Sequence, residues 1–136
     1  MAEHAYIKWM DDTGQAIQLE EIKKWFLYYR ELAAKTGKQL NWTYEEAAFP
    51  YSMREQESGG VNWLVLDSDT DRYHSILVRA GQEENTGLSY IEVILPPAST
   101  HGDKSKANEL CKFLAKKLSG ELHLFNKRIM HFPKKK

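Results

Sequence analysis

The sequence has little of what marks secreted and membrane proteins. Cys111 is its single cysteine, so no disulfide can form within the chain. No apolar run approaches the roughly 20 residues that a membrane-spanning helix needs. The first residues do not show a charged region followed by an apolar one, as a secretion signal does. These absences predict a cytoplasmic location and no membrane partner.

Motifs for catalysis and cofactor binding are also lacking. Gly59 and Gly60 form a lone pair, and no glycine-rich phosphate loop occurs. The five histidines do not follow zinc-ligand spacing. A two-residue turn at 126–127 would place His123 and His131 on opposite sides of the closing hairpin. The sequence therefore predicts no catalytic residue, no metal and no cofactor, and leaves open whether the protein is an enzyme.

The composition is that of a folded domain. Of the 136 residues, 42% are hydrophobic and 12% aromatic, which suits one domain over residues 1–136 with a frayed basic tail at 133–136. The net charge is zero, but residues 1–100 carry a balance of −7 and residues 101–136 a balance of +7. This asymmetry fits a basic surface for a polyanion, or an acidic body that the basic end neutralises within the molecule or across a dimer.

The order of the expected elements defines the fold class. Strand patterns occur at 5–10, 51–56, three times within 61–97, and in a hairpin at 121–125 and 128–132. Helical patterns occur at 19–36 and 104–119, and a short helical turn is expected after Thr43. We predict an α+β fold in the order β-α-α-β-β-β-β-α-β-β: an antiparallel sheet of about five to seven strands packed by two main helices.

The first helix has two apolar stripes. The first stripe follows spacings of three and four residues and comprises Leu19, Ile22, Phe26, Tyr29 and Ala33. The second stripe, beside it, comprises Trp25, Tyr28 and Leu32. Together the two stripes form an apolar face that is wider than contact with one sheet needs. The helix is therefore expected to touch two surfaces.

The central strands are apolar on both sides, with Glu92 and Arg79 as the main exceptions. Something is therefore expected to cover the second face: the C-terminal helix, a partner subunit or a ligand. If both helices share one face, the remaining apolar face predicts a homodimer.

Aromatic residues are dense at 42–51 and suggest the wall of a ligand pocket. The candidate ligand-binding residues are Trp42, Tyr44, Phe49 and Tyr51, with Tyr28 and Arg30. A connecting segment also needs large side chains to pin it to the core, so the same rings have a structural interpretation.

Basic residues near the C-terminus suggest a polyanion or nucleic-acid site. The candidates are Lys112, Lys116, Lys117 and Arg128. A helix coated with lysine is also an ordinary solvated surface, and no recognised nucleic-acid module accompanies these residues.

Four short segments resemble a known family. They are Ala-Tyr-Ile-Lys at 5–8, Lys-Thr-Gly-Lys-Gln-Leu at 35–40, Ala-Ala-Phe-Pro-Tyr at 47–51 and Gly-Glu-Leu-His-Leu-Phe-Asn at 120–126. Together they are similar to a family of small uncharacterised proteins from Bacillus-type bacteria, classed as a domain of unknown function. That resemblance implies no catalytic or binding residue.

Three functions follow in order of preference. The first is a small non-catalytic interaction module that forms a homodimer or binds an unidentified protein partner. The second is a small-molecule-binding protein or enzyme that uses the aromatic segment, and the third is a polyanion binder that uses the basic C-terminal region.

Overall fold

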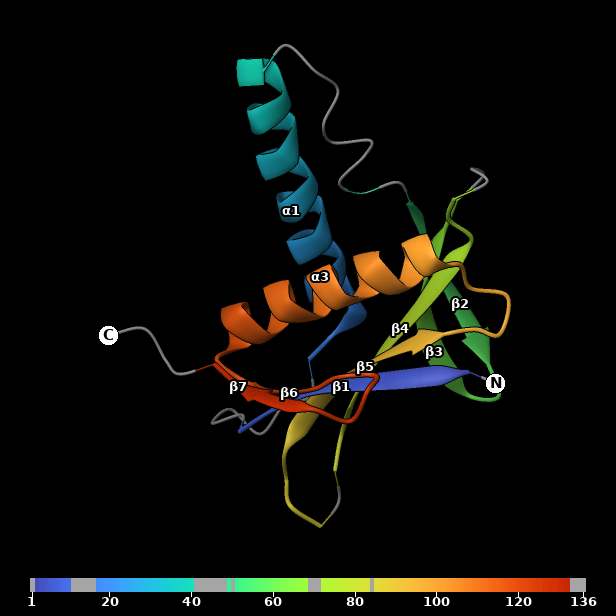
Figure 1. Ribbon diagram of the computed structural model, residues 1–136. Coiled ribbons are helices and arrows are strands. Elements are labelled where there is room, and N and C mark those ends of the chain that lie inside the picture. The colour runs from blue at the N-terminus through green and yellow to red at the C-terminus, as the bar shows by residue number, and fades with distance from the viewer. Residues whose placement is uncertain are drawn as a thin grey trace.

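A computed structural model describes residues 2–10, 17–40, 49, 51–68, 72–83 and 85–132. These residues form two helices and seven strands, which agrees with the predicted α+β class (Figure 1). The elements are β1 (Glu3–Trp9), α1 (Leu19–Leu40), β2 (Ser52–Ser58), β3 (Val61–Asp67), β4 (Ser75–Gln82), β5 (Ser89–Leu95), α3 (His101–Leu118), β6 (Glu121–His123) and β7 (Ile129–His131). The short helical turn expected after Thr43 lies outside the described residues.

The strands form one antiparallel sheet in the order β2-β3-β4-β5-β1-β6-β7. Strands β2 to β5 follow one another as a meander, and the N-terminal strand is inserted between β5 and β6. The β2–β3 turn requires glycine, because Gly59 and Gly60 have φ values of 58° and 79°. Insertion of β1 brings the first residues of the chain against residues about 85 positions later, such as Tyr6 opposite Glu92.

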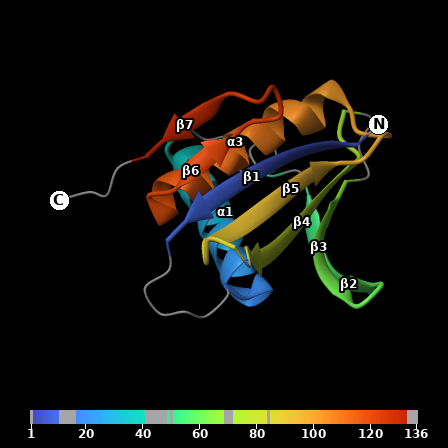
Figure 2. The same ribbon diagram turned by 90° about the horizontal axis from the view of Figure 1, so that it is seen from below.

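Both helices cover the same face of the sheet (Figure 1). Helix α3 packs over β1, β4, β5 and β6, whereas α1 contacts β3 and its later turns project beyond α3. Ile22 and Phe26 of α1 share one apolar core with Leu110 and Leu114 of α3. The opposite face of the sheet, seen from its own side in Figure 2, has no helix over it in the described part of the chain.

Helix α3 begins at His101, three residues before the pattern at 104–119, and a capping box precedes it. Thr100 is the N-cap, its side chain accepts a hydrogen bond from the Asp103 amide, and the Asp103 carboxylate accepts one from the Thr100 amide. The helix ends at Ser119, which adopts the left-handed conformation. Gly120 serves close packing, since a Cβ atom there would lie 2.9 Å from the Lys8 carbonyl oxygen.

Two local expectations were wrong. The helical pattern at 19–36 does not mark the end of α1, which continues to Leu40. In the C-terminal hairpin, His123 pairs with Ile129 and Glu121 with His131, because residues 124–128 form a longer turn in which Lys127 has φ 69°. This register places His123 and His131 on the same side of the hairpin.

Among the described residues, neither helix combines the length and the apolar character that crossing a bilayer requires.

Candidate functional site

The face without helices carries a buried charged cluster at its centre. Arg79 of β4 lies directly opposite Glu92 of β5, and Glu92 lies opposite Tyr6 of β1. Because side chains alternate along a strand, all three point away from the helices. Glu92 is only 2% exposed although no helix covers it.

Glu92 accepts hydrogen bonds from three side chains. Arg79 donates its Nε–H to Oε1, the Tyr6 hydroxyl also donates, and His4 Nδ1 lies 2.7 Å from Oε2. An ionised carboxylate only accepts, so the proton of His4 is on Nδ1 in this contact. Burial alone would raise the pKa of Glu92, but the hydrogen bonds from Tyr6, His4 and Arg79 hold it below its usual value. The carboxylate is therefore ionised and fully engaged.

Aromatic rings surround this cluster. The Arg79 guanidinium lies 5.2 Å from the centre of the Trp63 ring, and Tyr6 meets Tyr90 edge to face at 6.2 Å. Gly81 leaves the space that Tyr90 fills, since a Cβ atom there would lie 2.6 Å from the Tyr90 hydroxyl oxygen. Burial and the contact with Glu92 raise the pKa of Tyr6 to about 12, so this hydroxyl stays a donor at neutral pH.

The second face is therefore largely covered by its own side chains. Val65 and Ile94, two apolar residues of this face, are only 4% and 8% exposed. The sequence left three candidates for covering this face: the C-terminal helix, a partner subunit or a ligand. The C-terminal helix is excluded, because α3 packs on the other face of the sheet.

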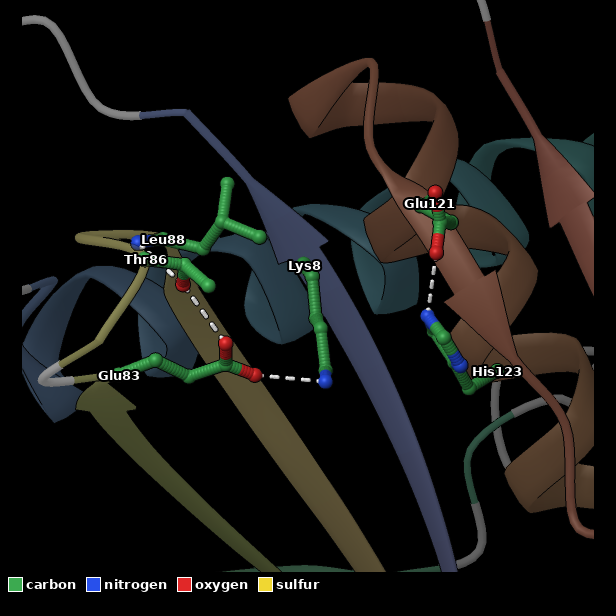
Figure 3. A network of polar contacts seen from close by, with 6 residues as sticks. All are labelled: Lys8, Glu83, Thr86, Leu88, Glu121 and His123. Carbon is green, nitrogen blue, oxygen red and sulfur yellow. Dashed lines mark hydrogen bonds and ion pairs between the residues drawn. The ribbon is translucent and has the colours of Figure 1, made fainter.

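A second polar network is formed by Lys8, Glu83 and Thr86, which Figure 3 shows. Lys8 Nζ lies 2.6 Å from Glu83 Oε1, and Thr86 Oγ1 donates to Glu83 Oε2 at 2.7 Å. These hydrogen bonds from Lys8 and Thr86 lower the pKa of Glu83. Lys8 Nζ also lies 5.7 Å from the centre of the Tyr6 ring and so joins the network to the cluster.

The hairpin histidines meet at one carboxylate. His123 Nε2 lies 2.6 Å from Glu121 Oε1, and His131 Nδ1 lies 3.6 Å from Oε2 (Figure 3 for Glu121 and His123). Within the described ranges no group of three or more His, Cys, Asp or Glu side chains is arranged to hold a metal ion.

The predicted aromatic wall is divided between core, surface and undescribed residues. Phe49 and Tyr51 are 2% and 4% exposed and stack within the core, and the Tyr51 hydroxyl donates to the buried Asp103 at 2.6 Å. Tyr28 and Arg30 are exposed on α1. Trp42 and Tyr44 lie outside the described residues. Phe49 and Tyr51 thus belong to the hydrophobic core.

The predicted basic site is also divided. Lys112 and Arg128 line one groove of about 470 Å³ between α3 and the β6–β7 turn. Lys117 faces α1 instead, where its Nζ lies 5.7 Å and 5.5 Å from the ring centres of Trp25 and Tyr28. Lys116 is exposed and does not line the groove.

The comparisons with known proteins identify the family. The family model described as "Domain of unknown function (DUF1885)" matches residues 3–134. The chain belongs to this family. The fold is similar to the crystal structure of a protein of unknown function from Bacillus stearothermophilus, with 41% identity, coverage of 91% of this chain and 95% of that chain, and a TM-score of 0.61. No curated protein matches the sequence.

The family resemblance inferred from four short segments is confirmed by these matches. Neither match assigns a functional residue to this DUF1885 protein, so its candidate sites rest on geometry alone. In the sequence, Glu92 and Arg79 stand out only as polar exceptions in apolar strands, and no sequence signal marks His4 or Tyr6. Their role depends on β1 lying beside β5, which the local pattern does not reveal.

Proposed function

We propose that this protein is a small, non-catalytic interaction module that self-associates through helix α1. The observation behind this proposal is the second stripe of α1, formed by Trp25, Tyr28 and Leu32. Tyr28 is 49% exposed and Leu32 is 41% exposed, while Ile22 and Phe26 on the first stripe are fully buried. Lys117 of α3 lies against the Trp25 and Tyr28 rings but leaves about half of Tyr28 exposed. Exposed apolar side chains on a helix that projects from the body are typical of an interface.

The charges at the two ends of this stripe favour a second copy of the chain as the partner. Glu21 and Lys35 each lie seven residues from Tyr28, on the same side of the helix, and both are exposed. A two-fold axis at Tyr28 would pair the helices antiparallel and place Glu21 of each copy against Lys35 of the other. Both ends of the interface would then have opposite charges in contact.

The buried ionisable groups support a non-catalytic role. The ionised Glu92 is engaged by its donors, Asp103 caps α3, and Lys106 is paired with Glu109 at 2.8 Å. Burial raises the pKa of the Cys111 thiol to about 12, which makes it a poor nucleophile. Each of these groups has a structural role. A single buried thiol also suits a reducing compartment, so we place the protein in the cytoplasm.

The test is the mass of the full chain in solution, measured by size exclusion with light scattering over a range of protein and salt concentrations. We expect a concentration-dependent dimer of twice 15.8 kDa. Tyr28→Lys and Leu32→Lys place a charge in the apolar stripe, so both should favour the monomer.

Leu27→Lys is the matched control. Leu27 is 45% exposed on α1 but lies about 100° around the helix from Tyr28, so its replacement should leave the dimer intact. A wild-type monomer at every concentration would refute the proposal, and so would a dimer that only Leu27→Lys disrupts.

A further inference from the structure

The groove between α3 and the β6–β7 turn has a chemistry that self-association through α1 does not explain. Its polar and aromatic lining comprises Lys104, Asn108, Lys112, Phe125, Asn126 and Arg128. Its volume of about 470 Å³ lies in the range of small-molecule sites. Figure 1 shows the turn lying along α3, on the side of that helix away from α1.

Positive charge dominates the groove. Lys104, Lys112 and Arg128 contribute three cations, and no carboxylate lines the groove in the described part of the chain. Lys104 has a long contact of 3.4 Å to the exposed Glu3, and no ion pair of Lys112 or Arg128 is found among the described residues. This surface is suited to an anion.

The fold holds these side chains in place from two directions. Lys104, Asn108 and Lys112 are spaced four residues apart and so lie on one side of α3. On the facing turn, the Arg128 amide donates to Asn126 Oδ1 at 3.0 Å, and the Leu124 amide donates to the Arg128 carbonyl at 2.9 Å. The left-handed Lys127 between them fixes the turn that presents Arg128.

The same groove offers an apolar surface next to the cations. Phe125 contributes an aromatic ring, while Ile129 and Met130 are 51% and 37% exposed. A ligand with a phosphate at one end and a flat ring at the other would use both parts. Bases stack on aromatic side chains, and Lys and Arg bind phosphate oxygens.

We propose that this groove binds a nucleoside phosphate, with its phosphates between Lys112 and Arg128 and its base against Phe125 and Met130. A small nucleotide fits better than a nucleic-acid strand because, within the described ranges, the basic residues do not form a continuous track. Lys117 faces α1, and Lys106 is paired with Glu109.

The test is calorimetric titration of the full chain with ATP and with AMP at low ionic strength. Lys112→Gln and Arg128→Gln should each weaken binding about tenfold, because each removes one charged phosphate contact. Lys116→Gln is the matched control: it removes an exposed lysine one turn further along α3, outside the groove. It should bind as the wild type does.

Phe125→Leu should weaken binding of both nucleotides but not of inorganic phosphate, since it removes the ring on which the base would stack and keeps an apolar side chain against the core. The thermal midpoint of each variant checks that the fold is intact. The proposal is overturned if neither nucleotide binds at millimolar concentration, or if Lys116→Gln weakens binding as much as Lys112→Gln. A single-stranded oligonucleotide that binds more tightly than either nucleotide would identify a polyanion surface instead, if its binding is weakened equally by the Lys112, Lys116 and Arg128 replacements.

Discussion

Arg79 and Glu92 lie directly opposite one another on neighbouring strands, and the arginine donates its Nε–H to a carboxylate that solvent barely reaches. The pair is at the centre of the face that has no helix over it. With His4, Tyr6 and Trp63 around it, the pair gives this face a covering of its own. A sheet face that looked in need of a partner is thus largely closed by long polar and aromatic side chains.

Replacing Glu92 tests whether this cluster stabilises the fold. Glu92→Gln keeps the shape but leaves the partly exposed Arg79 without its counter-charge, so we expect a loss of about 2 kcal/mol in the free energy of unfolding. Urea unfolding at pH 7 measures it. Glu57→Gln removes an exposed carboxylate of β2 and should change stability by less than about 0.5 kcal/mol. Equal effects of the two replacements would contradict the role of the cluster.

The same variant should reveal a pH dependence of known sign. The pKa of Glu92 in the folded protein lies below its usual value of 4.5. The contribution of Glu92 is therefore complete above the unfolded-state pKa and is lost as the pH falls through the folded-state pKa. The difference between wild type and Glu92→Gln should be present at neutral pH and shrink below about pH 4.5. A difference that grows below about pH 4.5 would contradict the lowered pKa.

The fold was accessible from the sequence because its signals are local. The alternation of Ile7 and Trp9, the stripe of Ile22 and Phe26, and the glycine pair at the β2–β3 turn each identify an element without knowledge of its neighbours. Both helices, the strands and the α+β class are therefore confirmed.

The candidate surfaces depend on contacts that local patterns do not contain. Glu92 meets Tyr6 only because β1 is inserted beside β5, and Lys112 and Arg128 line one groove only because the hairpin turns back along α3. The aromatic run ending at Tyr51 could be read as a pocket or an anchor. Only the buried hydrogen bond to Asp103 shows the anchoring role of Tyr51.

Asp103 should be more important to stability than any one of its donors. Its carboxylate accepts hydrogen bonds from the Tyr51 hydroxyl at 2.6 Å and from the His74 and Thr100 amides at 3.0 Å. Asp103→Ala leaves all three without this acceptor and removes the capping box, so we expect a loss of about 3 kcal/mol. Tyr51→Phe removes one of these bonds and should cost about 1 kcal/mol. Chemical unfolding of both variants measures the two losses of stability. A larger loss for Tyr51→Phe than for Asp103→Ala would show that Asp103 is not the most important member of this network.

The antiparallel pairing of α1 predicts a charge-reversal pattern. Glu21→Lys would face Lys35 of the other copy at both ends of the interface, so the dimer should dissociate about tenfold more readily. Glu21→Lys combined with Lys35→Glu restores opposite charges and should recover most of the affinity. Analytical ultracentrifugation measures the dissociation constants. If the double variant is as weak as the single one, the helices do not pair in this register.

Cys111 offers a measurement of how tightly the core is closed. The thiol is fully buried, and burial raises its pKa to about 12, so at pH 8 the reactive thiolate is scarce and shielded from reagents. A disulfide reagent such as Ellman's should label the native protein very slowly. In denaturant the same thiol should react at once, and since Cys111 is the single cysteine of the chain, the signal has one source. The labelling rate should therefore rise with urea concentration in parallel with global unfolding. Rapid labelling under native conditions would mean that α3 separates from the sheet without unfolding of the whole domain.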